Sequence, residues 1–563
     1  MSTDSFMNPT DDMRHSMIKE SLQMLGRPED YEYIVKLLSP PKEITTLAAP
    51  GEMKGLKIGI IGGGLAGMAA AYELRKMGAD ITILEALEDR IGGRVYTYYF
   101  DEPGKYYAEF GPMRVPVTHE TTWHYINLLQ LDTISASTPM PNAFRYVHNV
   151  RLRMTDSIEQ YLYPLYDLTP EERSTPWTDI TNYAFTYPMK QLPPEVRAEM
   201  LQILPEYSPQ YLPFINTSVR QYVENLGLSQ GAMNLMYDLN PILAALFPLS
   251  YDEEATENYS LDFLNIYRIR DGFVNLPLAF YHTFHESNPI QYNNLPKDKL
   301  GNVTYKPGHL VTGLYQYANR QQKVQVQYMN TYEAHESIEE FDYVICTIPF
   351  SALRTVEIRP LFTNQKMQAI YQLNYIDSQK SAFYCNQRFW EKNTYYGNIN
   401  GGISITDLPI KFIVYPNDHI YDTRDKLQLA AEPGVLTASY NFGQDAVRLG
   451  NLEDWRRYGV IRSNVEEVHG LPRGYLDTIV EAFKMVHWNT EPHFRGAFAM
   501  SLPGQKNLYA YQMLQPEYNN HLFFAGEHLS TKHGWIQGAL YTGKDAANKL
   551  LMSFQSRKST QSE

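Results

Sequence analysis

Three glycines, Gly62, Gly64 and Gly67, carry the clearest chemical signal in the chain, because their spacing suits a phosphate-binding turn. In such a turn the first glycine permits a sharp change of direction. The second lets the backbone approach a pyrophosphate, and the third lets a helix pack closely on a strand. Leu65 and Ala66 lie between them at the start of an alanine-rich segment, where the first N–H groups of a helix lack partners and can face a phosphate. The chemistry that this spacing predicts is dinucleotide binding.

These glycines need a strand before them and a helix after them, and the surrounding sequence predicts both. Residues 58–61 form a short β-branched apolar run, which suits a buried strand. Residues 68–77 predict a helix, and residues 81–84 predict a second strand that ends in Glu85. An acid in that place can accept hydrogen bonds from a ribose. Since all these parts agree in order, we prefer a nucleotide site to the alternative, a glycine-rich turn without a ligand.

A second glycine-rich element, Gly92-Gly93-Arg94, follows this acid and Ala86. The two glycines allow another close backbone approach, and Arg94 can neutralise a pyrophosphate or reach the edge of a flavin. A nicotinamide enzyme does not need this element. Together with Glu85 and Ala86, it resembles the FAD-binding signature of the flavin amine oxidases, so the resemblance implies FAD as the cofactor.

The composition is that of a globular enzyme with more than one domain. A chain of 563 residues is too long for one core, which predicts two or three domains. The net charge of −14 argues against a nucleic-acid partner, because phosphate binding needs a basic surface. The two cysteines, Cys346 and Cys385, argue against a disulfide scaffold, and no Cys/His cluster predicts a metal site. No segment has the ~20 apolar residues of a membrane span, and the first residues do not form a secretory signal. A cytoplasmic location is therefore the default expectation.

The segment after the first nucleotide-binding unit contains the string Gly111-Pro112-Met113-Arg114. Gly111 and Pro112 force a turn, so Arg114 is a cation on a defined stretch of backbone. On physical grounds alone, a surface arginine is the slightly favoured interpretation. The string resembles the motif of the L-amino acid oxidases, whose arginine binds the substrate carboxylate. A planar guanidinium can hold a carboxylate through two parallel hydrogen bonds, and simple amine oxidases have no carboxylate to hold.

A strand near the C-terminus carries the other half of the resemblance. Residues 522–527 predict a buried strand that ends in Gly526 and Glu527. Flavin amine oxidases use this acid on the ribitol chain of FAD. Covalent monoamine oxidases carry a flavin-linked cysteine near the following turn. None is present here, so the resemblance implies non-covalent FAD.

That turn reads His-Gly-Trp-Ile-Gln-Gly over residues 533–538, which resembles the version in L-amino acid oxidases. The resemblance makes Trp535 one wall of an aromatic cage beside the flavin, and the carbonyl of Gly534 the acceptor for the substrate amine. Ile536 belongs to the same cofactor-binding turn. A helix that starts at Gly538 can direct its N-terminal N–H groups at flavin N1 and O2, where its dipole favours negative charge.

Three further residues take roles only through the resemblance. Lys380 falls in a strand predicted over residues 378–384, where periodicity alone favours a lysine that faces solvent. Its family counterpart holds a water against flavin N5. A lysine so close to a flavin should be partly desolvated, which lowers its pKa, so Lys380 could act in proton transfer or oxygen activation. Tyr415, in a predicted strand over residues 411–416, matches the tyrosine that completes the carboxylate site, and a purely structural role is about equally favoured. Val311 is the best match for the valine whose backbone contacts the adenine.

The middle of the chain resembles the family least. Residues 150–270 predict mainly helices, among them 218–226 and 229–246, which in related oxidases line the way into the active site. An acidic patch lies at the end of this region, and a solvated loop is the favoured interpretation. The alternative is a preference for substrates with cationic side chains. The patch consists of Asp252, Glu253, Glu254 and Glu257.

The two ends carry separate expectations. Residues 11–25 predict a helix with an apolar side, which should pack on another domain instead of forming a free tail. Residues from Ser553 onward are polar and are predicted to be disordered.

The resemblance extends over about residues 50–552 and implies an α/β protein. Its parts are a doubly wound, Rossmann-like FAD-binding domain, a mixed-sheet substrate domain and a helical domain. We assign the FAD-binding domain to residues 51–100, 272–365 and 490–552, the substrate-binding domain to residues 1–50, 101–150 and 366–489, and the helical domain to residues 151–271.

The activity that the resemblance implies is FAD-dependent oxidative deamination of L-amino acids. The α-hydrogen leaves as a hydride to flavin N5, and the products are a 2-oxo acid, ammonia and hydrogen peroxide. The partners are then a small L-amino acid and oxygen, and related enzymes are commonly homodimers. Two alternatives stay open: an amine or polyamine oxidase of the same fold, and a flavin-binding protein that is not an oxidase.

Overall fold

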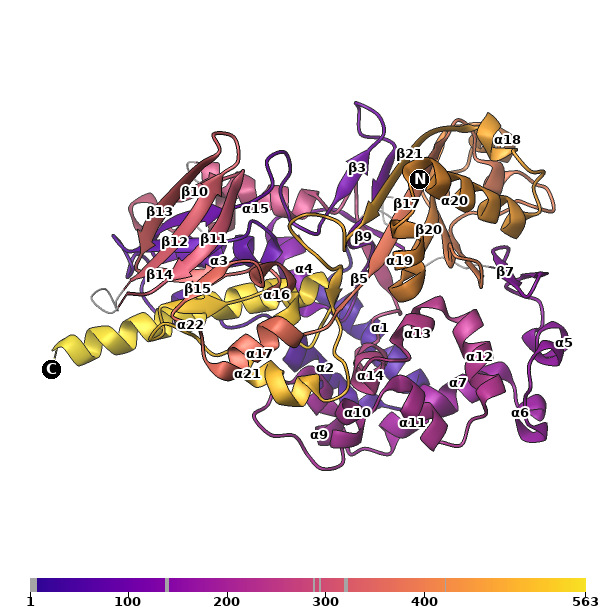
Figure 1. The fold of residues 1–563 in the computed structure, drawn as a ribbon, viewed down its shortest axis with the longest axis horizontal. Helices are drawn as coiled ribbons and strands as arrows, with labels where there is room; N and C mark the ends of the chain where they lie inside the picture. Colours follow the sequence, from indigo (N-terminus) through magenta and orange to yellow (C-terminus); the bar gives the residue numbers. More distant parts are fainter. Residues whose placement is uncertain are drawn as a thin grey trace.

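The computed structural model describes residues 8–136, 141–286, 289–292, 295–317, 323–420 and 422–562. A small parallel sheet and the C-terminal helix lie at one end of the molecule, and a large mixed sheet lies at the other (Figure 1). A group of short helices lies below the mixed sheet in this view. The candidate site is built where these three parts meet.

A parallel sheet of five strands surrounds the glycine-rich turn. Strands covered on both faces need nearly continuous apolar residues, and the last four residues of the central strand are all buried. Since the carboxyl ends of parallel strands meet at one edge, the turn at Gly62 and the acid Glu85 come together there. The strand order is β10 (Val303–Lys306), β2 (Asp80–Leu84), β1 (Lys57–Ile61), β14 (Tyr343–Cys346) and β23 (Leu522–Phe524).

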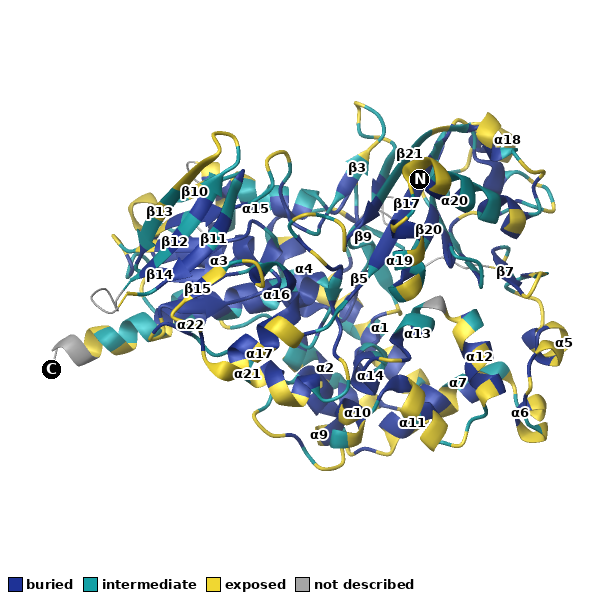
Figure 2. Ribbon diagram, in the orientation of Figure 1, coloured by how far each residue is buried: buried dark blue, intermediate teal, exposed yellow. Residues whose placement is uncertain are grey.

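Two helices from opposite ends of the chain pack together against this sheet. Every residue of α3 (Leu65–Lys76) is buried, and α22 (Ile536–Ser562) packs on it. They approach so closely that a Cβ on Gly543 would lie 2.3 Å from the carbonyl oxygen of Ala66. Figure 2 shows that α22 is buried beneath the sheet and more exposed further along. Because α22 continues to Ser562, the predicted disorder from Ser553 onward is wrong.

A second sheet, antiparallel except for one pair, adjoins the parallel one. Its strand β11 has an irregular register between Val311 and Gly313 where it pairs with β12. The strand order is β13 (His335–Phe341), β12 (Val324–Asn330), β11 (His309–Tyr315) and β15 (Glu357–Arg359).

The large mixed sheet has seven strands, and its two faces have different neighbours. One face packs against α20 (Asp454–His469), whose Ile461 and Val465 share a core with Ile413. The other face borders the cavity described below. All neighbouring strands are antiparallel except β18 and β7. The order is β21 (Val480–His487), β17 (Ser378–Cys385), β20 (Gly434–Phe442), β19 (Phe412–Tyr415), β18 (Gly402–Thr406), β7 (Phe144–Val147) and β8 (Val150–Arg153).

The helical region follows the sequence expectations with one difference. Helix α11 (Val219–Asn225) begins with a capping box at Ser218, as its sequence predicts. The single helix predicted over residues 229–246 is instead two, α12 (Gln230–Leu239) and α13 (Pro241–Leu246). The break falls before Pro241 because a proline nitrogen has no hydrogen to donate to the preceding turn.

The N-terminal helix α1 (Asp11–Met24) packs on the rest of the molecule through Ile18 and Leu22, which are fully buried in the largest core. The expectation that this segment is not a free tail is therefore confirmed. Within the described residues no helix is both long and apolar enough to span a membrane. The cytoplasmic location and the domain boundaries stay predictions.

Candidate active site

A cavity of about 1010 Å³ runs from the glycine-rich turn to the helical region. Its walls come from the carboxyl edge of the parallel sheet, one face of the mixed sheet, and helices α7 (Trp177–Phe185), α13 and α14 (Tyr251–Tyr259). Most of the residues predicted from the sequence lie on this wall. They are Gly62, Gly64, Leu65, Ala66, Glu85, Ala86, Arg94, Gly111, Pro112, Met113, Arg114, Val311, Lys380, Gly526, Glu527, Gly534, Trp535 and Ile536.

The glycine-rich turn has the geometry that its spacing predicts. Gly62 has a φ of 101°, in the region that favours glycine. A Cβ on Gly67 would lie 2.1 Å from the carbonyl oxygen of Gly62, so Gly67 packs helix against turn and does not face the cavity. Gly64 caps α3 without a side-chain hydrogen bond, which leaves the first N–H groups of the helix open to the cavity.

Glu85 lies at the end of β2 with its carboxylate held by the backbone. It accepts hydrogen bonds from the N–H of Gly63 at 2.6 Å and of Leu87 at 2.9 Å. Burial raises the pKa of its carboxyl group. The N–H of His309 donates to the carbonyl of Glu85 at 2.7 Å, which brings β11 and Val311 to the same wall. A carboxylate fixed in this way can receive hydroxyl groups of a ribose.

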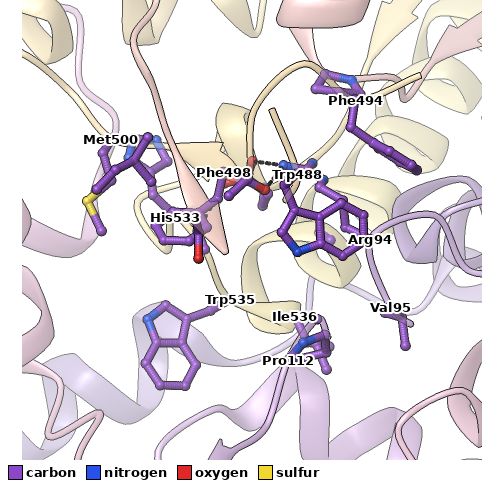
Figure 3. A pocket seen from close by; sticks show the side chains of 18 of the residues that line it. Arg94, Val95, Pro112, Trp488, Phe494, Phe498, Met500, His533, Trp535 and Ile536 are labelled. Carbon is purple, nitrogen blue, oxygen red and sulfur yellow. Dashed lines mark hydrogen bonds and ion pairs between the residues drawn. The ribbon is translucent and has the colours of Figure 1, made fainter. Parts of the chain in front are cut away.

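Arg94 and Glu527 form an ion pair in the middle of the cavity wall. Arg94 donates to Glu527 at 2.8 Å and to the carbonyl of Ala497 at 2.9 Å. Glu527 also accepts from the N–H of Ala499 at 3.2 Å and of Gly534 at 3.0 Å. Figure 3 shows Arg94 near Trp488 on this side of the cavity. The pair thus joins the two predicted FAD-binding ends of the chain.

These residues fit FAD. The turn presents open N–H groups and no side chain to the cavity at Gly64, as a pyrophosphate requires. A fixed carboxylate at Glu85 suits the adenosine ribose. The cavity continues past the Arg94–Glu527 pair toward Trp535, so its length can take both halves of a dinucleotide.

Lys380 lies on the cavity wall next to the segment from Gly111 to Arg114. Its Nζ donates to the carbonyl of Gly111, and it lies 4.5 Å from the ring centroid of Tyr440. The side chain is 3% exposed, so the interpretation as a solvent-facing lysine is wrong. Burial is the main cause that lowers the pKa of Lys380 to about 7, and the charge of Arg114 acts in the same direction.

Arg114 is a cation in the cavity wall whose guanidinium forms no hydrogen bond or ion pair with any of the described residues. Burial lowers its pKa, while the nearby Tyr440 and Glu257 act in the opposite direction. A guanidinium keeps its charge under such conditions. An unpaired cation in a largely apolar cavity is a site for an anion, and a carboxylate matches its two parallel donors.

Trp535 reaches into the cavity from the turn before α22 (Figure 3). Its Nε1 donates to Glu257 at 2.8 Å. The ring of His119 stands perpendicular to the indole at a centroid distance of 4.9 Å, and that of Phe263 lies at 6.0 Å. Gly534, with a φ of 73°, turns the chain so that the indole lies in the wall. Trp535 is thereby fixed in orientation.

Comparison with known proteins shows the family. Residues 65–551 match the family described as flavin containing amine oxidoreductase. The chain belongs to this family. Its FAD cofactor and α/β fold follow from that membership.

Two relatives and one solved structure are similar to this flavin amine oxidoreductase. The L-amino-acid oxidase of Protobothrops flavoviridis is 26% identical over 494 residues, 87% of each chain. That of Crotalus adamanteus is 26% identical over 540 residues, 94% of this chain and 92% of the relative. A putrescine oxidase bound to putrescine superposes with a TM-score of 0.65 at 16% identity, covering 88% of this chain and 99% of that one.

The role predicted for Tyr415 in this flavin amine oxidoreductase is wrong. Its hydroxyl shares hydrogen bonds of 2.8 Å with Ser404 and His469 in the core beneath α20, and it does not line the cavity. Side chains alternate between the faces of a strand, so Phe412 of the same strand faces the cavity instead. Tyr440 on the neighbouring strand β20 lies there too, next to Lys380.

Like Gly67, Gly538 is a predicted cofactor-binding residue that does not line the cavity. A Cβ there would lie 2.1 Å from Oγ of Ser530, so the position needs glycine for packing. Helix α22 begins two residues earlier than predicted, at Ile536, which does line the cavity.

Sequence reasoning also missed Trp488, which lies just after β21. It lines the cavity, and its Nε1 donates to the carbonyl of Phe110 at 2.9 Å. Its ring stands perpendicular to that of Phe494 at 5.2 Å, and Figure 3 shows both. A tryptophan at the end of a strand gives no distinctive spacing, so the sequence offered only its residue type as a signal.

The acidic patch is not a solvated loop, and that interpretation is wrong. All four acids belong to α14, a helix whose Tyr251 and Tyr259 are fully buried. Glu254 and Glu257 line the cavity.

Proposed function

We propose that this flavin amine oxidoreductase oxidises L-amino acids to 2-oxo acids and releases ammonia and hydrogen peroxide. The observation that carries the proposal is the unpaired guanidinium of Arg114 in the wall of the FAD cavity. A plain amine has nothing to offer this cation, whereas the carboxylate of an amino acid does. The relatives named L-amino-acid oxidase support the same choice.

FAD, when bound, supplies the chemistry: it takes two electrons and a hydrogen from the α-carbon and passes the electrons to oxygen. The chain's own residues bind and orient the substrate. Arg114 holds the carboxylate, and the carbonyl of Gly534 accepts a hydrogen bond from the amine. Trp535, held by Glu257, closes one side of the space between them. Such positioning supplies much of the rate, because a held substrate needs no further search for its reactive orientation.

Lys380 is the group placed to manage a proton. Its pKa of about 7 leaves a large neutral fraction at neutral pH. A substrate enters as an ammonium and must lose a proton before its nitrogen lone pair can support the developing imine. Lys380 Nζ, between Gly111 and Tyr440, can accept a proton within the cavity.

The test is peroxide release by the purified holoprotein against the twenty L-amino acids, their D-enantiomers and a few amines. We expect peroxide with at least one L-amino acid and none with its D-enantiomer. The flavin absorbance should bleach with that amino acid in the absence of oxygen and return in air.

Turnover of an amine but not of its amino-acid analogue would replace this proposal with an amine or polyamine oxidase. A normally bound flavin that yields no peroxide with any of these compounds would favour a flavoprotein that is not an oxidase.

A further inference from the structure

The acids of α14, together with Asp262, divide into two groups according to whether they face the cavity. Three of them point away from it, and each is held by a lysine or a histidine. A buried carboxylate needs such a partner, because desolvation strongly disfavours its charge. The three pairs are Asp252 with Lys506 at 2.9 Å, Glu253 with His533 at 3.0 Å, and Asp262 with Lys532.

The other two, Glu254 and Glu257, line the cavity and have no cation among the described residues within ion-pair distance. Glu254 accepts a hydrogen bond from Asn258 at 3.0 Å, and Glu257 accepts one from Trp535 at 2.8 Å. They lie three positions apart on α14 and therefore on the same side of the helix. The helix thus presents two carboxylates without cations to the space where the substrate binds.

The rest of this wall suits a hydrocarbon chain. Many of the side chains that α7, α13 and the mixed sheet turn toward the cavity are apolar. A long cationic side chain can bury its methylene groups on apolar surface while its charged end reaches a carboxylate. The apolar residues are Phe185, Ile242, Leu243, Leu246, Phe412 and Phe442.

We propose that Glu254 and Glu257 select L-amino acids whose side chain ends in a cation, such as lysine, ornithine and arginine. This rests on the proposed function, because Arg114 must hold the carboxylate for the side chain to reach α14. Burial raises the pKa of both acids, that of Glu257 to about 8, which disfavours their charged forms until a cation arrives. The ligand then supplies the missing partner.

Three compounds separate the contribution of the side-chain ammonium from that of the carboxylate. Lysine has both ends, norleucine lacks the terminal ammonium, and cadaverine lacks the carboxylate. For the holoenzyme we expect kcat/KM for lysine to exceed that for norleucine by at least about 30-fold, the size of effect that follows loss of one partner of a buried pair. Equal kcat/KM values for lysine and norleucine would overturn the proposal and leave the proposed function standing.

Two variants test whether the carboxylates are responsible. Glu254→Gln and Glu257→Gln keep the hydrogen bonds but remove the charge. We expect each to lower the lysine-to-norleucine ratio at least about tenfold, since charge-assisted pairs in buried sites are worth more than neutral ones. Glu195→Gln removes an exposed carboxylate from the same helical region and should leave the ratio unchanged. An unchanged ratio in both cavity variants would overturn the proposal.

A stability measurement tests whether Glu254 and Glu257 lack a cationic partner, without relying on activity. Asp262→Asn leaves Lys532 buried without its carboxylate and should lower the midpoint of thermal unfolding. Glu254→Gln and Glu257→Gln leave no cation behind and should not lower it. A large drop in both would mean that these acids have internal partners, which would overturn the proposal. Higher kcat/KM for cadaverine than for lysine would instead overturn the proposed function.

Discussion

At the scale of single residues, the cavity contains ionisable groups that the protein itself does not pair with an opposite charge. Arg114 has no anionic partner, and Glu254 and Glu257 have no cationic one, among the described residues. Keeping such groups out of water is unfavourable in the free protein. A ligand with complementary charges removes that penalty, so these positions favour one class of substrate over its uncharged analogues.

The carboxylate role of Arg114 predicts a selective defect. In Arg114→Met, kcat/KM for an amino acid should fall, because the carboxylate loses its charged partner. The fall should correspond to a loss of about 2 to 5 kcal/mol in transition-state stabilisation. The defect with cadaverine should be smaller than tenfold, because this amine has no carboxylate. Equal losses for the amino acid and the amine, measured by initial rates of peroxide release, would contradict the assignment. Arg114→Lys keeps the charge without the paired donors. Its kcat/KM for the amino acid should lie between those of wild type and Arg114→Met.

The buried state of Lys380 predicts a pH-dependent contribution to stability. Its pKa is about 7 in the folded chain, against an ordinary value of 10.5 for an exposed lysine. Between these pH values the unfolded chain binds a proton that the folded chain does not, so the free energy of unfolding rises with pH. Wild type should therefore gain stability relative to Lys380→Met from pH 7 to 10, on the order of 4 kcal/mol. Below pH 7 the difference should be constant.

Urea denaturation of the holoprotein at several pH values measures this. The exposed Lys426 provides the control, because Lys426→Met should give a difference from wild type that does not vary with pH. A Lys380→Met curve parallel to wild type across this range would show that the lysine is not buried in its neutral form.

At the scale of elements, the unit formed by β1, the glycine-rich turn and α3 depends on one very close contact. In Gly67→Ala, the new Cβ would lie 2.1 Å from the carbonyl oxygen of Gly62, so helix or turn must move. We expect loss of FAD binding, seen as a colourless purified protein, because the N–H groups that face the pyrophosphate would shift with the turn.

Helix α20 offers the matched control for this glycine substitution. Gly459 lies inside that helix, and a Cβ there would have nothing within 4 Å. Gly459→Ala should leave FAD binding intact and stabilise the fold by about 0.4 to 1 kcal/mol, because alanine restricts the unfolded chain. If Gly67→Ala retained FAD as well, the close packing would not be what the turn requires.

At the scale of the whole molecule, the N-terminal helix is tied to the rest through a buried ion pair. Arg14 binds Glu120 at 2.8 Å and donates to the carbonyl of Val117 at 2.7 Å. Arg14→Met should destabilise the protein by about 3 to 5 kcal/mol, because the buried Glu120 would lose both hydrogen bonds from the guanidinium. Asp11 also binds Arg14 but is exposed, so Asp11→Asn should change the free energy of unfolding by less than about 1 kcal/mol. Equal effects in urea denaturation would contradict this view of α1.

The molecule also brings together segments far apart in the chain. Arg94 forms an ion pair with Glu527, and Lys380 donates a hydrogen bond to Gly111. Neither contact could be assigned from sequence spacing. The predicted homodimer stays a prediction, for which the mass in solution is the measurement.

The sequence by itself determined the nucleotide-binding turn and much of the fold. Gly62, Gly64, Gly67 and Glu85 act within one short strand–turn–helix–strand unit, where local residue types fix the backbone. The family signatures at both ends of the chain added the cofactor.

Only the tertiary structure decided which side chains face the substrate space. Adjacent residues of a strand turn their side chains to opposite faces, which is why Tyr415 lies in the core and Val414 in the cavity. The acids of α14 are similar in sequence, yet some meet cations from distant segments and others face the cavity. Burial and charge pairing arise from contacts across the chain, and such contacts leave no signal in local spacing.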